Sequence, residues 1–268
     1  MMEATLSDRE VRMILDAYER SYLYLDEVPS FAERRKALLD RRDRSVAVLN
    51  SWFRDNVQWD TITKVHARYG VSHKVTFEYP AESMVLVRTK CLDAESCNRI
   101  LIDLKDMQPD ILLLDLRGCT GDDPEAALEL VGALAEGEIC TQRFRTFDRV
   151  TVSRRVSVRP HMVFVFTDKD TKGCGLMAAV SLYLNSDKVT VLGVPNESEP
   201  VGKVMMEGIG SNPKLVFSMA SYRWSVHGRG PEVFDDPDPE RFIVCISEDI
   251  REMMSAVYDC IRERGWQI

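Results

Sequence analysis

The chain has 268 residues, of which 45% are hydrophobic and 29% are charged, so it can bury a substantial core. Its formal net charge of −8 argues against a nucleic-acid partner, because binding to a phosphate backbone depends on clustered Lys and Arg. The basic run between Arg34 and Arg42 is interleaved with acidic residues. It predicts a solvated helix face and not a nucleic-acid or membrane-binding patch.

Two further absences in the sequence narrow the class of protein. Residues 1–11 are polar and acidic, unlike the apolar centre of a signal peptide, and no apolar run approaches the length of a membrane span. The seven cysteines are an odd number without CxxC pairs or His-bearing metal spacings. We therefore expect a cytoplasmic protein with reduced thiols, no bound metal and no cofactor.

The first 60 residues predict a helical region. Residues Ser7 to Glu10 have the pattern of a capping box, and apolar residues follow at helical spacing as far as Leu25. The Pro29-Ser30 pair breaks this helix, and the spacing predicts a second helix over residues 31–56. We expect a helical hairpin that is either a packing appendage or an arm for dimerisation or for guiding a substrate.

The next part of the chain alternates between predicted strands and helices. Strands are predicted at residues 74–79, 83–88 and 111–117, and helices at 93–107 and 126–135. The run 111–117 is continuously apolar before its charged end, which is typical of a strand buried on both faces. A glycine-bearing loop, 118–121, follows directly, and a strand or hairpin is predicted over 144–158.

The central stretch carries the candidate nucleophile. Residues 162–166 predict a buried strand, residues 176–184 a buried helix and residues 189–193 a second strand. Between the first strand and the helix lies Gly173-Cys174-Gly175. A thiol on such a turn would sit at the positive end of the helix dipole, which lowers its pKa and activates it as a nucleophile. Beyond this stretch, residues 215–224 predict a strand, and 247–263 a helix that begins at Ser247.

Two stretches together resemble the tail-specific, or carboxy-terminal processing, peptidases. Residues 111–121 are similar to that family's strand ending in Asp-Leu-Arg and its glycine-bearing oxyanion loop. Counting back without gaps from the strand at Leu192-Gly193 puts Cys174 at the position of the family's nucleophilic serine, and Gly202-Lys203 falls where the family has its catalytic lysine. The resemblance covers residues 84–266.

The resemblance implies an α/β fold of the crotonase-like (ClpP/crotonase) type, with a ββα core. It implies a catalytic domain over residues 61–268, preceded by the helical region 1–60, and no PDZ insertion is evident. It also implies a catalytic Ser/Lys dyad, but in this chain a cysteine, Cys174, stands at the position of the serine. Met177 replaces a glutamate found in many relatives, Asp122 replaces one of two adjacent glycines, and extra residues lie between Gly193 and Lys203.

The residues implied by the resemblance can support acyl-transfer chemistry. Cys174 would attack a peptide or other acyl substrate, and Lys203 would act as its base. The backbone N–H groups of Gly121 and Gly175 would form the oxyanion hole. His227 is a possible alternative base, although a turn histidine facing solvent is the simpler interpretation.

Three alternatives to a cysteine peptidase stay open at this point. Cys174 can be an introduced replacement for the nucleophilic serine. The chain can also be a catalytically inactive peptide-binding relative in which Cys174 is an inert small residue. It can also be a crotonase-type thioester enzyme, which would use the oxyanion loops without a nucleophile. The partner expected under all but the last interpretation is a peptide or protein.

Overall fold

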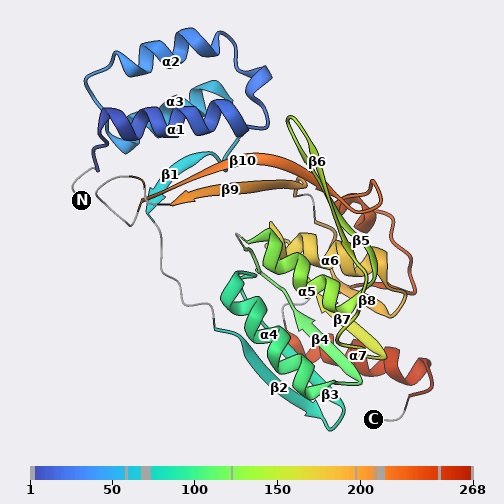
Figure 1. The fold of residues 1–268 in the computed structure, drawn as a ribbon. Helices are drawn as coiled ribbons and strands as arrows, with labels where there is room; N and C mark the ends of the chain where they lie inside the picture. Colours follow the sequence, from blue (N-terminus) through green and yellow to red (C-terminus); the bar gives the residue numbers. More distant parts are fainter. Residues whose placement is uncertain are drawn as a thin grey trace. The chain divides into compact units, whose positions relative to one another are not determined.

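The computed structural model describes residues 4–57, 60–67, 74–121, 123–196, 198–207, 209, 215–246 and 249–266. The chain divides into two compact units (Figure 1). The first contains residues 1–71, 143–148 and 201–223, and the second contains residues 72–142, 149–200 and 224–268. This grouping differs from the sequence-based division at residue 60, because strands from later in the chain complete the first unit.

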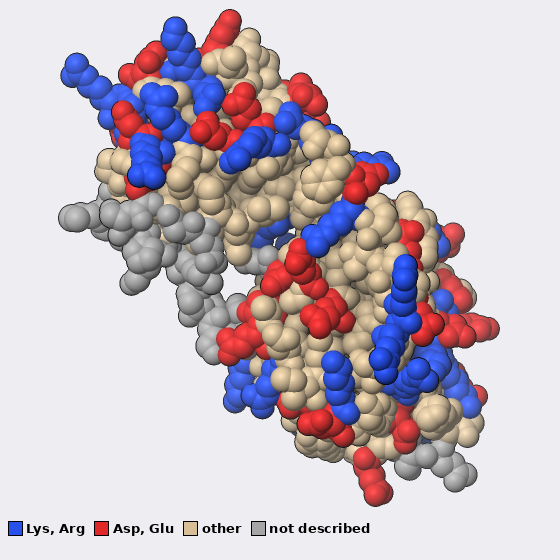
Figure 2. Space-filling model, viewed as in Figure 1, with Lys and Arg blue, Asp and Glu red and all other residues tan. Residues whose placement is uncertain are grey.

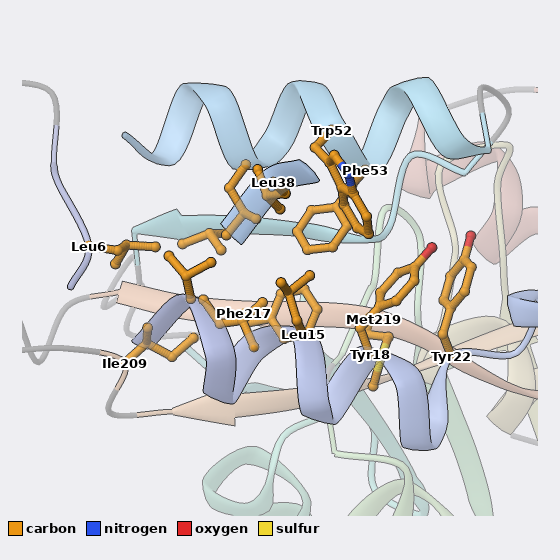
Figure 3. Close-up of a cluster of buried hydrophobic side chains, with 14 of the residues drawn as sticks. Leu6, Leu15, Tyr18, Tyr22, Leu38, Trp52, Phe53, Ile209, Phe217 and Met219 are labelled. Atoms are coloured by element: carbon orange, nitrogen blue, oxygen red, sulfur yellow. The ribbon is translucent and has the colours of Figure 1, made fainter. Parts of the chain in front are cut away.

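The first unit packs three helices on a small antiparallel sheet. The helices are α1 (Asp8–Ser21), α2 (Phe31–Leu39) and α3 (Val46–Asn56), and the strands are β1 (Lys64–Ala67), β9 (Val201–Glu207) and β10 (Leu215–Ser225). Strand β10 pairs with both β1 and β9. The core between the layers is aromatic (Figure 3): Tyr18 stacks on Tyr22, and Phe53 stacks on Phe217 of β10. The capping box predicted at Ser7 is present.

The prediction of one helix over residues 31–56 is wrong, because a non-helical segment separates α2 from α3. Arg44 donates hydrogen bonds to the carbonyl groups of Leu38 and Leu39, which satisfies the end of α2. The Ser45 hydroxyl accepts from the N–H of Val48 and caps the start of α3. The six residues between Leu39 and Val46 are all polar or charged, so the break coincides with a gap in the apolar pattern.

The basic residues of this unit pair with acidic residues nearby. Arg35 forms ion pairs with Asp16 and Glu19, and Arg44 pairs with Asp8. Figure 2 shows the Lys and Arg side chains intermixed with Asp and Glu side chains over α1 to α3. On this face the unit therefore carries charges of both signs and no large basic patch.

The second unit is built on a six-stranded sheet in the order β11-β8-β7-β4-β3-β2. Its strands are β2 (Thr76–Ala81), β3 (Met84–Arg88), β4 (Ile111–Asp115), β7 (Met162–Phe166), β8 (Val189–Gly193) and β11 (Phe242–Val244). All neighbouring pairs are parallel except β2 with β3. Strands β4, β7 and β8 are buried along their whole length, which confirms the strands predicted from continuous apolar runs.

Helices cover both faces of this sheet. Helices α4 (Ala94–Met107), α5 (Pro124–Leu134) and α6 (Cys174–Asn185) pack side by side on one face, and α7 (Ile250–Glu263) covers the other (Figure 1). Helix α7 is capped by Asp249, and the predicted start at Ser247 lies outside the described residues. Strands β5 (Gly137–Phe144) and β6 (Asp148–Ser153) form a hairpin that begins seven residues before the strand or hairpin predicted over 144–158 and ends five residues before its end.

Within the described residues, every helix is too short or too polar to cross a membrane.

Candidate functional site

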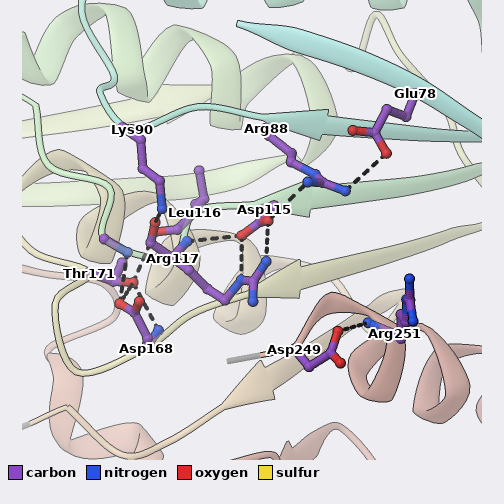
Figure 4. A network of polar contacts seen from close by, with 11 residues as sticks. Glu78, Arg88, Lys90, Asp115, Leu116, Arg117, Asp168, Thr171, Asp249 and Arg251 are labelled. Carbon is purple, nitrogen blue, oxygen red and sulfur yellow. Dashed lines mark hydrogen bonds and ion pairs between the residues drawn. The ribbon is translucent and has the colours of Figure 1, made fainter. Parts of the chain in front are cut away.

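The candidate site lies where the parallel strands of the second unit end. The loops after β4, β7 and β8 leave the sheet at the same edge, because parallel strands share one carboxyl end. Figure 4 shows the polar side chains that gather there. The loop after β7 runs directly into α6, and the loop after β4 lies against it.

Cys174 is the first residue of α6, which begins two residues before the helix predicted from residue 176. Gly173 precedes it with φ +53° and ψ −126°, a backbone conformation that residues with a side chain rarely adopt. The Cys174 side chain is buried, with 5% of its surface exposed. Met177, one helical turn further on, is also buried. The sulfur atom therefore sits at the positive end of the helix in a nearly closed environment.

Glycines from two loops enclose Cys174. A methyl group added at Gly121, whose φ is +152°, would lie 2.9 Å from the Cβ of Cys174 and 2.4 Å from the carbonyl oxygen of Leu92. A methyl group added at Gly175 would lie 2.7 Å from the carbonyl oxygen of Cys119. The loops are also joined by a hydrogen bond from the N–H of Lys172 to that same oxygen, at 2.8 Å. The fold thus brings Gly121, Cys174 and Gly175 together.

One of the two expected oxyanion donors already has a hydrogen-bond acceptor. The N–H of Gly175 donates to the carbonyl oxygen of Lys172 at 3.1 Å, which closes the turn before α6. An oxyanion at this position would have to compete with that bond. Asp122, which was expected to affect the shape of the other loop, lies outside the described residues.

Lys203 belongs to the first unit and not to the unit that holds Cys174. It lies on β9, where it pairs with Ala220 of β10. The preceding Gly202 pairs with Tyr222, whose ring lies over the glycine so closely that an added methyl group would be 1.9 Å from it. The pairing of Lys203 with Cys174 stays a prediction.

The structure does not bring His227 to Cys174. The imidazole Nε2 of His227 lies 3.1 Å from Oδ1 of Asn185, the last residue of α6. Asn185 is eleven residues beyond Cys174, which is about 16 Å along a helix with a rise of 1.5 Å per residue. The alternative base is therefore at the opposite end of the helix from the thiol.

Three residues that the sequence did not single out hold the loops together. The Asp168 carboxylate accepts hydrogen bonds from the Gly118 N–H at 2.8 Å and from the Thr171 hydroxyl at 2.9 Å. The Asn196 side-chain amide donates to the carbonyl oxygens of Asp168 at 3.1 Å and Thr171 at 2.7 Å. We call Asp168, Thr171 and Asn196 the loop clamp, because it ties the loops that follow β4, β7 and β8.

An ion-pair network flanks the loop clamp at the end of β4. Arg117 binds the buried Asp115 carboxylate through two hydrogen bonds, of 2.8 and 2.6 Å, and these raise the pKa of Arg117. Arg88 lies 3.9 Å from the same carboxylate, and the Lys90 ammonium donates to the carbonyl oxygen of Arg117. These contacts fix the base of the loop 118–121.

The other cysteines are buried, except for the partly exposed Cys245. All seven lie in the described residues and none is in a disulfide. Burial raises the pKa of the Cys97 and Cys140 thiols to about 12, and raises that of Cys119 further. Among the residues that the structure describes, no group of three or more His, Cys, Asp or Glu could hold a metal ion.

Comparison with known proteins gives a fold and no family. No family model matches the sequence, and no curated protein does. Solved structures do match the fold. A lipoprotein from Streptococcus agalactiae has a TM-score of 0.67 at 14% identity, covering 97% of this chain and 99% of the other. The photosystem II D1 C-terminal processing protease has a TM-score of 0.59 at 11% identity, with 90% and 93% covered.

A third solved structure that matches the fold is also described as a peptidase. It is described as a candidate peptidase from Parabacteroides merdae ATCC 43184, and it has a TM-score of 0.55 at 12% identity, with 97% and 99% covered. The chain thus has the mixed α/β fold of the carboxy-terminal processing proteases, including helices at the N-terminus, at low sequence identity. This likeness is one of fold alone.

Proposed function

We propose that the chain is a peptidase, or a related acyl-transfer hydrolase, in which Cys174 is the nucleophile and Lys203 its base. The observation that carries the proposal is the position of Cys174 at the start of α6, enclosed by Gly121 and Gly175. A helix N-terminus stabilises a thiolate, and a ring of backbone groups around it suits a developing oxyanion. The processing-protease fold supports a peptide as the substrate.

The proposed reaction passes through a thioester. The Cys174 sulfur forms a bond to the substrate carbonyl carbon, and the electron pair of the C=O bond moves to the oxygen. Collapse of this intermediate breaks the C–N bond, and the amine leaves with a proton supplied by Lys203. Lys203 then takes a proton from the water that attacks the thioester carbon, the C–S bond breaks, and the acid product leaves as the Cys174 thiolate re-forms beside the Lys203 ammonium.

The proposal is tested by the rate at which iodoacetamide labels each cysteine of the folded protein. Cys245 is the most accessible thiol, whereas Cys97 and Cys140 stay protonated at neutral pH. An activated Cys174 should be labelled ahead of Cys245 despite its burial, with a pH–rate midpoint below the value of about 8.5 for a free thiol. Labelling in order of exposure, with Cys245 first, would contradict the proposal.

The role of Lys203 is tested separately. Lys203→Met should move the labelling midpoint of Cys174 to higher pH and abolish peptide cleavage, because the thiolate loses its counter-ion and proton donor. Lys188→Met is the matched control, since Lys188 is an exposed lysine beyond the far end of α6. Equal midpoints in the two variants would remove Lys203 from the mechanism.

A second candidate function is a peptide-binding protein without catalysis. It is favoured by the hydrogen bond from Gly175 N–H to Lys172, which occupies an expected oxyanion donor. Such a protein would bind peptides without turnover, and Cys174→Ala would leave the affinity unchanged. Detection by mass spectrometry of a cleavage product that is absent with Cys174→Ala would decide for the peptidase.

A further inference from the structure

Strands β5 and β6 belong to the same five-stranded sheet as β1, β9 and β10, in the order β1-β10-β5-β6 with β9 also pairing with β10. Strand β6 is therefore an edge strand, and none of the other described strands lies on its outer edge. Such an edge presents unpaired backbone N–H and C=O groups to any strand that can approach. Figure 1 shows β5 and β6 as a long hairpin.

The two faces of β6 differ in character. On one face, Arg149 forms an ion pair with Glu125 of α5 at 2.6 Å, and the Ser153 hydroxyl donates to the carbonyl oxygen of Gly132 at 2.7 Å. On the other face, Val150 is 54% exposed and Val152 is 53% exposed. Side chains alternate along a strand, so Asp148, the first residue of β6, lies on the same face as these valines, and the exposed Arg154, the first residue after β6, continues that alternation.

The exposed face of β6 therefore reads Asp148, Val150, Val152, Arg154, which is a self-complementary pattern. We propose that β6 pairs antiparallel with β6 of a second copy of this chain, about a two-fold axis at Thr151. In that register Asp148 lies opposite Arg154 of the second copy, and Val150 lies opposite Val152. Symmetry repeats both pairs, so the two charges and the two valines are all matched.

Charge complementarity favours a second copy of this chain as the partner that pairs with the edge of β6. An isologous interface needs a surface that complements itself, and a strand with an acidic start, a basic end and two central valines meets that need. Asp148 also forms an ion pair with Arg143 at 3.5 Å, between two exposed side chains. A surface pair of this kind contributes little stability, so it does not oppose the proposed contact.

Charge exchange tests the interface. Sedimentation equilibrium of the full chain, up to about 0.5 mM because one strand pair is smaller than a standard interface, should show a monomer–dimer equilibrium. Asp148→Arg and Arg154→Asp should each weaken association about tenfold, since like charges would face each other twice. The double exchange should restore it. Arg143→Ala is the control, because it removes the ion pair within the hairpin and should leave association unchanged.

Cysteine pairing tests the register. Val150→Cys mixed with Val152→Cys should give a disulfide-linked dimer in oxidised glutathione, because these positions lie directly opposite. Either variant alone should not, since identical positions are diagonal and about 7–8 Å apart. A chain that is monomeric at every concentration, a double exchange that fails to restore association, or equal cross-linking of each variant alone would overturn the proposal.

Discussion

Replacing Asn196 tests whether the loop clamp supports the second unit. Its side chain is 4% exposed, and its amide donates to two carbonyl oxygens, of Asp168 and Thr171. In Asn196→Ala both oxygens lose a donor inside the protein, and each loss costs about 1–2 kcal/mol. We therefore expect a decrease of about 2–4 kcal/mol in the free energy of unfolding. The urea midpoint should fall by about 1 M, for a slope near 3 kcal/mol per M.

Asn196→Asp adds a pH dependence with a definite sign. The variant keeps the size of the side chain but places a carboxylate against two carbonyl oxygens, which raises its folded-state pKa above the unfolded value of about 3.9. The free energy of unfolding of the variant then decreases as the pH rises from 3.9 through the folded-state pKa, and it recovers as the pH falls back towards 3.9. The difference from wild type should be largest at pH 7 and smaller at pH 5.

Urea unfolding followed by far-UV circular dichroism measures both variants. Asn185→Ala is the matched control, because its amide donates to the Ser181 carbonyl within α6 and its Oδ1 contacts the exposed His227, so it joins none of the loops that follow β4, β7 and β8. We expect it to cost less than about 1 kcal/mol. Equal losses in Asn196→Ala and Asn185→Ala, or a pH-independent loss in Asn196→Asp, would refute the idea that Asn196 ties the loops.

Two further changes have expected results. Gly202→Ala puts a methyl group 1.9 Å from the Tyr222 ring, so it should cost about 1–3 kcal/mol and lower the thermal midpoint. In a Tyr222→Ala background, Gly202→Ala should cost less than it does beside the tyrosine, and an equal cost in both backgrounds would contradict the close contact. The guanidinium of Arg241 lies 4.6 Å from the centre of the Tyr183 ring and donates hydrogen bonds to the carbonyl groups of Tyr183 and Ser186 at the end of α6. Lysine cannot replace both kinds of contact, so Arg241→Lys should destabilise the unit nearly as much as Arg241→Ala does. We expect a loss of about 2–3 kcal/mol for each variant in urea unfolding.

The strands and helices of the second unit follow from local sequence patterns. The apolar runs at 111–117, 162–166 and 189–193 predict buried strands, and the structure has a fully buried strand in each, the first ending at Asp115. The helix predicted over 176–184 is α6, which begins two residues earlier, at Cys174. Because these strands are parallel, their sequence also places the glycine loop beside Cys174.

Other features depend on contacts between residues far apart in the chain. Asn196 lies 25 residues beyond Thr171, the residue whose carbonyl it binds, and no local pattern marks that contact. The break between α2 and α3 depends on where Arg44 finds acceptors. Lys203 follows a glycine as the family resemblance requires, but its membership of the first unit is decided by the pairing of β9 with β10. An Asp-x-x-Thr turn at Asp168 is the one local signal that could have indicated the loop clamp.

The sheet order has a consequence for how the chain reaches its native state. In the second unit, β3, β4, β7 and β8 lie side by side in the order in which they are synthesised, so this sheet can grow strand by strand behind the ribosome. The first unit has to wait, because β1 pairs with β10, and Lys64 finds Ser218 only after 154 further residues have been made. Until then the face of the Phe53 ring that stacks on Phe217 in the native state lacks this partner. The end of the chain that is made first is therefore the part that finishes last, and it needs protection from aggregation meanwhile.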